Sequence, residues 1–235
     1  MNQSLTPNNP ALATSNFAIK NRIVANLGYG INLSETNRLS ANVYFNAQSG
    51  NPFSWGFVNS TIANTGQAAG LAYIFKDAAE AAKYLVSYKD GAGNTVSVQQ
   101  QVSDYENFIN SNKYLSSRRG KFTERNGDFT PWNVQADFRI MDEIKLSNKN
   151  KNTIQISFSI MNITNLLNKD WGKVYFVPNT FNSTASVGLT KVGNVSGNVP
   201  EAGDPTYNFK TPGTPYTIDQ FASRFQGQLG IRYNF

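Results

Sequence analysis

Residues 221–235 read FASRFQGQLGIRYNF, and their side chains alternate between two kinds of position. The odd-numbered positions are apolar or small, whereas the even-numbered ones include two arginines and several amides. Successive side chains of a strand point to opposite faces, so one face of this segment suits hydrocarbon and the other suits water. The pattern predicts the closing strand of a transmembrane β-barrel.

Four other segments alternate in the same way over more residues than an ordinary globular strand. They are residues 19–33, 38–58, 131–146 and 153–164. In the central parts of all five segments every charge falls on the polar side. Asp142 and Asn21 break the pattern near strand ends, where a bulge or the headgroup zone would accommodate them. The polar sides carry Asn, Gln, Ser and a few Arg, which favours a barrel lumen. A soluble antiparallel sandwich is the alternative.

The composition agrees with a surface that meets both lipid and water. Charged residues make up 15% of the chain and aromatic residues 13%, and the mean hydropathy is −0.41. The chain has no cysteine and no histidine, which excludes disulfides, histidine-based catalysis and metal sites built from His or Cys. No carboxylate pair or nucleophile–base set is visible either. We therefore predict no enzyme activity and no cofactor, and the scattered basic residues predict no nucleic-acid partner.

The connections between the five segments are alternately short and long. Residues 34–37 and 147–152 form short connections, whereas residues 59–130 and 165–220 form long ones. Short periplasmic turns and long external loops are typical of outer-membrane barrels. The pattern predicts a periplasmic C-terminus in the outer membrane and makes residues 1–15 the tail of another external loop.

The long loops carry local signals of their own. In the first, Asp77 begins a capping box for an Ala-rich helix that ends near Tyr88, and Ser103 begins a second, shorter helix. In the second, residues 175–177 and 186–189 are expected to pair as an external hairpin.

Five strands do not close a barrel. The outer strands of an open sheet in lipid leave unpaired N–H and C=O groups, each of which is costly. We therefore expect the first and last strands to have partners outside this sequence, so that the chain is a piece of a longer protein. The N-terminal residues lack the basic and apolar regions of a signal peptide, so either an export signal lies upstream or the barrel interpretation fails.

Three stretches resemble a known family. They are FNAQSGNPFS at residues 45–54, LSSRRGKFTERNGDFTPW at residues 115–132 and IMNITNLLNK at residues 160–169. They resemble the C-terminal barrel segment of TonB-dependent outer-membrane receptors, in particular the Oar-like receptors of Bacteroidetes-type bacteria. The resemblance covers most of residues 15–235. It implies a barrel of about 22 strands, an N-terminal plug, and uptake of large or scarce substrates with energy from the TonB system.

The sequence departs from that family in one respect. It contains no plug, no TonB box and only five of the strands. The resemblance therefore implies partners that this chain lacks, namely the plug, the remaining strands and, through the plug, the TonB system. We expect that the fragment alone does not transport its unknown substrate.

Two groups of candidate site residues lie on the predicted strands. The apolar side of the last strand looks like the signal that the barrel-assembly machinery recognises by strand addition, and the same side is expected to face lipid; the alternative is that it is only a lipid-facing strand. These residues are Phe225, Leu229, Ile231, Tyr233 and Phe235. Charged residues on the polar sides would line the lumen and contact a plug. These residues are Arg22, Asp137, Arg139, Arg224 and Arg232.

Two further groups lie in the loops or at strand ends. A local basic run forms either an anionic-ligand patch or, as the favoured alternative, an ordinary solvated loop. Its residues are Lys113, Arg118, Arg119, Lys121 and Arg125. The tryptophans near the external strand ends form either an aromatic girdle at the lipid interface, which is favoured, or a stacking surface for sugars or peptides. These residues are Trp55, Trp132 and Trp171.

Two functions follow as hypotheses. The first is the C-terminal part of an outer-membrane TonB-dependent receptor, with outer-membrane lipid and the barrel-assembly machinery as direct partners. The alternative is a free-standing outer-membrane or secreted β-protein that acts as a binding or adhesion module. The sequence does not identify a substrate, because loops determine specificity and pattern arguments do not reach them.

Overall fold

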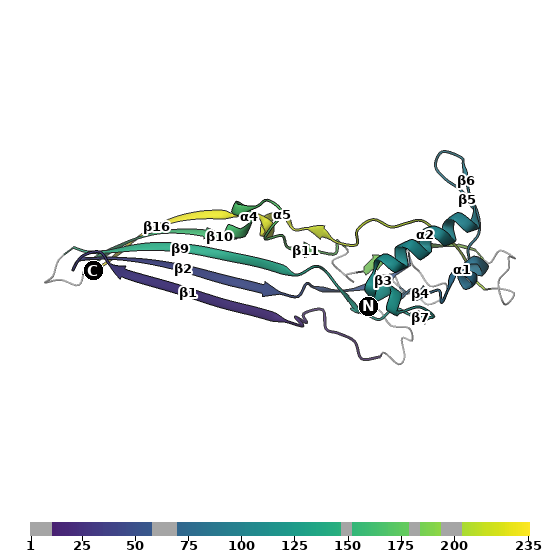
Figure 1. Cartoon of the computed structure of the whole chain (residues 1–235), viewed down its shortest axis with the longest axis horizontal. Helices are drawn as coiled ribbons and strands as arrows, with labels where there is room; N and C mark the ends of the chain where they lie inside the picture. Colours follow the sequence, from purple (N-terminus) through teal and green to yellow (C-terminus); the bar gives the residue numbers. More distant parts are fainter. Residues whose placement is uncertain (1–10, 58–69, 147–151, 179–183, 194–203) are drawn as a thin grey trace. The chain divides into compact units, whose positions relative to one another are not determined.

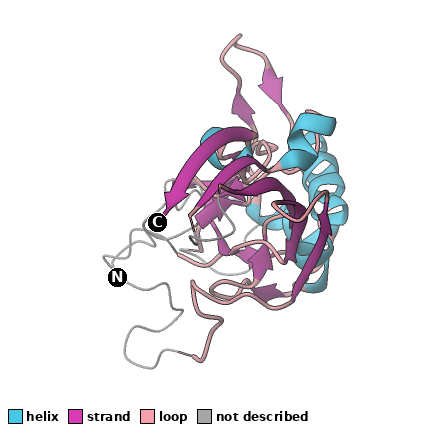
Figure 2. Cartoon of the chain, turned by 90° about the vertical axis from the view of Figure 1, so that its left-hand side faces the viewer, coloured by secondary structure: helices cyan, strands magenta, loops and turns pink. Residues whose placement is uncertain are grey.

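A computed structural model describes residues 11–57, 70–146, 152–178, 184–193 and 204–235. This part of the chain is mostly β, with short helices between the strands (Figure 2). It divides into two compact units, which we describe separately. The sheet unit comprises Ile19–Asn51, Thr130–Phe176 and Ile218–Phe235, and the loop unit comprises Met1–Ala18, Pro52–Phe129 and Val177–Thr217.

The sheet unit is built on five long antiparallel strands (Figure 1). They are β1 (Arg22–Asn32), β2 (Asn37–Gln48), β9 (Asn133–Lys145), β10 (Thr153–Met161) and β16 (Gln226–Asn234), and they pair in the order β1-β2-β9-β10-β16. Each lies within one of the five alternating segments or one residue outside it. The prediction of a mostly β chain with antiparallel pairing is therefore confirmed.

The pairing register puts the apolar sides of all five strands on one face of the sheet. Directly paired residues of neighbouring strands point to the same face. One row of paired residues across the whole sheet consists of Tyr29, Ala41, Ile140, Phe158 and Leu229. We call this side the apolar face.

The next row along the strands lies on the opposite side, which we call the polar face. It consists of Gly28, Asn42, Arg139, Ser159 and Gln228. A few apolar residues, such as Val24 and Met141, also lie on this face. The period-two pattern of each strand is therefore matched by the register between strands, since a shift of one residue would mix the two faces.

Two strand ends differ from the prediction. The segment expected to run over residues 38–58 is divided into two strands, because β2 ends at Gln48 and residues 52–56 form a separate strand, β3 (Pro52–Gly56). Just after β2, Ser49 Oγ accepts the backbone N–H of Lys20 and Asn21. The last strand begins at Gln226 rather than at residue 221. Residues 220–223 instead form the short helix α5 (Gln220–Ser223), because Asp219 Oδ1 accepts the first N–H groups of that turn.

The remaining elements of the sheet unit follow β10. They are α4 (Ile163–Leu167) and β11 (Tyr175–Phe176). In Figure 1, α4 and α5 lie close together at the ends of β10 and β16. Both helices are short, so contacts with the sheet rather than helix propensity hold them in place.

Within its described residues, the loop unit contains three helices and several short strands. The helices are α1 (Ala78–Tyr84), α2 (Val98–Ser111) and α3 (Lys113–Ser117). The strands are β3 (Pro52–Gly56), β4 (Tyr73–Ile74), β5 (Tyr88–Lys89), β6 (Thr95–Val96), β7 (Lys121–Phe122), β8 (Asp128–Phe129), β12 (Thr184–Ser186), β13 (Leu189–Gly193) and β14 (Thr206–Phe209), and β15 (Thr217–Ile218) spans the boundary with the sheet unit. Within the unit β3 pairs with β12 and β8, β4 with β7, β5 with β6, and β13 with β14.

The loop unit has a hydrophobic core of its own. Its largest fully buried side chains include Trp55, Tyr105, Phe53 and Phe209, whose rings pack edge-on or tilted at centroid distances of 5.3–5.4 Å. The core draws on three stretches of the chain, since β3 follows β2, α1 and α2 lie in the first long connection, and β12 to β14 lie in the second. Parts of the two predicted loops therefore form one folded unit together with β3, whereas residues 165–176 of the second loop belong to the sheet unit.

The helix predictions in this unit are partly correct. Asp77 caps α1, but the helix ends at Tyr84 rather than near Tyr88, because Leu85 turns to extended backbone and Val86 N–H donates to Tyr207 O at 3.0 Å. The second helix starts earlier than predicted. Ser97, not Ser103, is its N-cap.

The predicted hairpin between residues 175–177 and 186–189 is wrong. β12 pairs in parallel with β3, and β13 pairs with β14. Leu189 and Val187 are fully buried in the core, so the burial of their side chains decides where this segment pairs.

Candidate functional site

The apolar face of the five-stranded sheet is the most unusual surface in the described part of the chain. Many of its large side chains are exposed, and Leu229, for example, keeps 69% of its surface. The exposed members on the outer strands include Ile23, Leu27, Tyr29, Ile31, Leu229, Ile231 and Tyr233. An exposed apolar patch of this extent marks a surface that meets a membrane or another protein.

The polar face is joined by side-chain hydrogen bonds between neighbouring strands. Asn42 Nδ2 donates to Asn26 Oδ1 at 2.7 Å, and Gln155 Nε2 donates to Glu143 Oε2 at 2.6 Å. Arg22 Nε donates to Asn46 Oδ1 at 2.8 Å. Short side chains with both donors and acceptors can satisfy one another here and still bind water. The sheet can therefore lie between an apolar medium and water.

One charged residue lies on the apolar face. Asp142 pairs with Leu39 on one side and Ile156 on the other, and the register runs through it without interruption. The bulge that would absorb this residue is therefore not present in the described strands. Asp142 Oδ1 is buried without a hydrogen-bond partner in the described structure.

Four of the five predicted lumen residues lie on the polar face. They are Arg22 on β1, Asp137 and Arg139 on β9, and Arg232 on β16. Arg224 follows α5 as its C-cap and lies before β16, so the register assigns it to neither face. The contact of these residues with a plug stays a prediction.

The predicted assembly signal is exposed. Leu229, Ile231 and Tyr233 lie on the apolar face of β16, whereas Phe225 and Phe235 lie just outside the strand. The Tyr233 and Phe235 rings stack with centroids 6.0 Å apart. All five side chains are exposed, and their recognition by the assembly machinery stays a prediction.

The three tryptophans have different environments. Trp132 and Trp171 are 45% and 55% exposed, and an interface role for them stays a prediction. The prediction for Trp55 is wrong, because this residue is only 1% exposed in the core of the loop unit. Its Nε1 donates to Asp128 Oδ2 at 2.8 Å, which satisfies the one polar atom of the buried ring.

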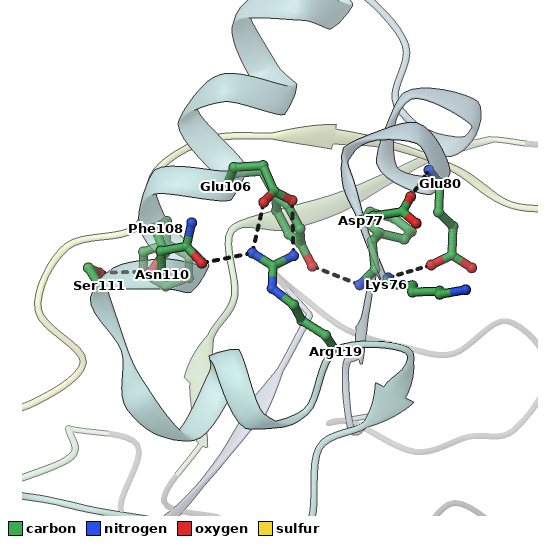
Figure 3. Close-up of polar contacts among 10 residues, drawn as sticks. Lys76, Asp77, Glu80, Glu106, Phe108, Asn110, Ser111 and Arg119 are labelled. Atoms are coloured by element: carbon green, nitrogen blue, oxygen red, sulfur yellow. Dashed lines mark hydrogen bonds and ion pairs between the residues drawn. The ribbon is translucent and has the colours of Figure 1, made fainter.

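The basic run is not a single open patch, because two of its arginines are bound within the loop unit. Arg119 donates to both carboxylate oxygens of Glu106, at 3.0 and 2.8 Å, and to Asn110 on α2 (Figure 3). Arg118 pairs with Glu124 at 2.9 Å and also donates to a backbone carbonyl.

The other three basic residues differ in exposure. Lys113 and Lys121 are exposed, and Arg125 is half-buried. The pairing of Arg118 and Arg119 favours the interpretation that the run is ordinary loop surface.

Asn162, which the alternating pattern did not mark as a candidate, is buried at the end of β10. It is 4% exposed and has a left-handed backbone, with φ of 53°. The available signal was an amide residue directly after an alternating strand and two residues before a threonine, a pattern that favours local side-chain to backbone bonding.

The described residues hold no group of three or more acidic residues that could bind a metal ion. No helix among them is long and apolar enough to cross a membrane. No protein-family model matches the chain, and no curated protein or solved structure shows significant similarity to it.

Proposed function

We propose that the sheet unit forms part of the wall of an outer-membrane β-barrel, with its apolar face in lipid and its polar face toward an aqueous lumen. The observation that carries this proposal is the register, which collects the apolar sides of five strands on one exposed face. Transfer of apolar surface out of water contributes roughly 25 cal/mol per Å². Hydrocarbon can cover the whole face at once.

The strand lengths support the same proposal. The five strands have 9 to 13 residues. A tilted strand needs about 9–11 residues to cross the hydrocarbon core, whereas strands in globular proteins usually have about 5–6. Within the described residues, β1 and β16 each pair on one side only. A barrel with further strands would pair their outer edges.

We propose further that this barrel belongs to a TonB-dependent receptor of the Oar-like kind. The support is the resemblance of residues 45–54, 115–132 and 160–169 to that family. In this proposal the loop unit lies outside the cell and the C-terminus lies in the periplasm. The plug, the TonB system and the unknown substrate would be partners of the full receptor, and this chain alone would not transport.

The alternative is a binding or adhesion module. The loop unit favours it, because a folded core gives its surface a fixed shape that can hold a partner. The two proposals differ in what the apolar face of the sheet contacts. Lipid supports the barrel, and a soluble chain whose apolar face is covered by protein supports the alternative.

Cysteine labelling along β16 separates the two proposals. The chain contains no cysteine, so Leu229→Cys and Gln228→Cys each introduce one labelling site, on neighbouring residues of opposite faces. Each variant is refolded into vesicles and labelled with a polarity-sensitive fluorophore. Brominated lipids should quench the label at residue 229 strongly and the label at residue 228 weakly.

Equal quenching at the two positions, or a chain that stays in the aqueous fraction, would refute the barrel proposal. Lys113→Cys in the loop unit serves as the control, because this residue is exposed and lies on neither face of the sheet. Its label should be insensitive to brominated lipids in either case.

A further inference from the structure

The alignment of β16 on β10 lacks the usual means of setting register. Short turns connect β1 to β2 and β9 to β10, and the length of such a turn fixes how the strands align. By contrast, residues 162–225 separate β10 from β16. Closing so long a connection leaves the ends free to pair in several registers. Some other contact must select one of them.

Asn162 makes such a contact at the end of β10. Its Nδ2 donates to Ser223 O at 2.8 Å and to Gly172 O at 2.9 Å. Its backbone N–H donates to Asp137 Oδ1 on β9 at 2.8 Å. One buried residue therefore ties the end of β10 both to β9 and to the turn that leads into β16.

Neighbouring groups hold this arrangement in place. Gln135 Nε2 on β9 donates to Ala222 O at 2.9 Å and to Gly172 O at 3.1 Å. Gly172 has φ of 65°, and a Cβ there would collide with Asn162 Oδ1. Thr164 Oγ1 donates to the same Oδ1 at 2.6 Å. Both the nitrogen and the oxygen of the Asn162 amide are therefore hydrogen-bonded, which opposes rotation of the amide group.

The other long connection has an analogous contact. Thr130 N–H donates to Asn51 O at 3.0 Å, and Asn51 N–H donates to Thr130 Oγ1 at 2.9 Å, just beyond the pairing of β2 with β9. Each long-range strand pair of the sheet is therefore fixed at the end opposite the short turns. At β10 and β16 the amide side chain of Asn162 donates the contact, whereas at β2 and β9 the two donors are backbone N–H groups, one of which donates to the Thr130 hydroxyl.

We infer that Asn162 is the positioning residue that sets the register of β16 on β10. In the observed register Ile231 lies on the apolar face and Arg232 on the polar face. A shift of one residue would exchange them, which burial on either face opposes. A shift of two residues keeps the faces, so the apolar pattern does not prevent it. Asn162 excludes that shift, in whichever medium the apolar face is buried.

Disulfide formation between β10 and β16 reports the register directly. The chain has no cysteine, and Ser159 is paired with Gln228. Ser159→Cys with Gln228→Cys reports the native register. Ser159→Cys with Gln226→Cys, or with Gly230→Cys, reports a shift of two residues. Directly opposed residues fall within the range that a disulfide spans, and diagonal ones, about 7–8 Å apart, do not.

The decisive substitution is Asn162→Gly in the full chain, folded in detergent micelles. Glycine keeps the left-handed backbone and removes only the amide. We expect the ratio of shifted to native disulfide to rise at least about fivefold, the change that the loss of one net hydrogen bond gives. Unchanged native disulfide with no shifted product would overturn the inference.

Two controls separate register from general folding. Asn165→Gly removes an amide that donates to two carbonyls of the same turn but does not contact Ser223, and it should leave the native disulfide unchanged. Asn26→Cys with Tyr44→Cys reports the β1–β2 pair. If Asn162→Gly abolished this disulfide too, Asn162 would act on the whole fold and the inference would fail. Loss of all β10–β16 products with the β1–β2 disulfide intact would support it.

Discussion

The two units of this chain place their apolar side chains in opposite ways. In the loop unit, Trp55, Tyr105 and Leu115 are almost completely buried, as in a water-soluble domain. In the sheet unit, Leu229 and Tyr29 lie on an exposed face, and the polar residues fill the other side. The hydrophobic effect acts on both. The loop unit therefore supplies its own apolar environment, whereas the apolar face of the sheet requires one from outside.

The largest expected effect comes from truncating matched leucines in the two units. Leu115→Ala leaves a cavity in the core of the loop unit and should lower the free energy of unfolding of that unit by about 2–5 kcal/mol. Leu229→Ala removes the same atoms from an exposed position in the sheet unit and should change the free energy of unfolding by less than about 0.5 kcal/mol. Denaturant titration followed by near-ultraviolet circular dichroism, which reports the aromatic core, measures both. Equal losses would contradict the separation into two units.

A smaller effect is expected from placing a charge on either face of the sheet. Ile231→Arg puts a guanidinium on the apolar face and should weaken insertion into lipid vesicles by about 2–4 kcal/mol if that position lies near the bilayer centre. Gln228→Arg puts the same group on the polar face and should leave insertion nearly unchanged. Sedimentation of vesicles over a range of lipid concentrations measures the difference. Equal partitioning would remove the main support for a lipid-facing surface.

The smallest effect compares two arginines. Arg119 is 22% exposed and makes a two-point contact with Glu106, so Arg119→Ala should destabilise the loop unit by about 1–2 kcal/mol after allowance for solvent screening. Arg22→Ala loses a single exposed hydrogen bond to the neutral Asn46 and should have a smaller effect. Thermal unfolding of both variants tests the order. A larger loss of stability from Arg22→Ala would contradict this order, because it would show that the Arg22–Asn46 hydrogen bond contributes more than the Arg119–Glu106 ion pair.

Strands were predictable where one periodicity decides the outcome. Between Arg22 and Asn32, or between Gln226 and Asn234, the alternation alone predicts which side chains share a face, and the register confirms it. Boundaries were less predictable, because local hydrogen bonds compete with the alternation. Asp219 turns residues 220–223 into a helix although they continue the alternating pattern, and Ser97 begins α2 six residues before the more obvious Ser103.

The loop unit was the least predictable region. Trp55 resembles an interface tryptophan because it lies near the end of a long predicted strand. In the structure it belongs to β3, and its contacts with β8 and α2 lie in the core of the loop unit. Arg118 and Arg119 read as free charges in the sequence, and their partners lie 6 and 13 residues away along the chain. Such partners are set by how helices pack, which local patterns do not encode.

The alternating pattern of the sequence is enough to predict long strands with one apolar and one polar side, because side-chain alternation in a strand is a local property of the backbone. That these strands bring their apolar sides to one common face is visible only in the tertiary structure. The register between strands depends on contacts between segments that are distant in the sequence, such as the contact between Asn162 and Ser223. That segments of both long connections form one unit also depends on the tertiary structure, because their buried side chains share one core.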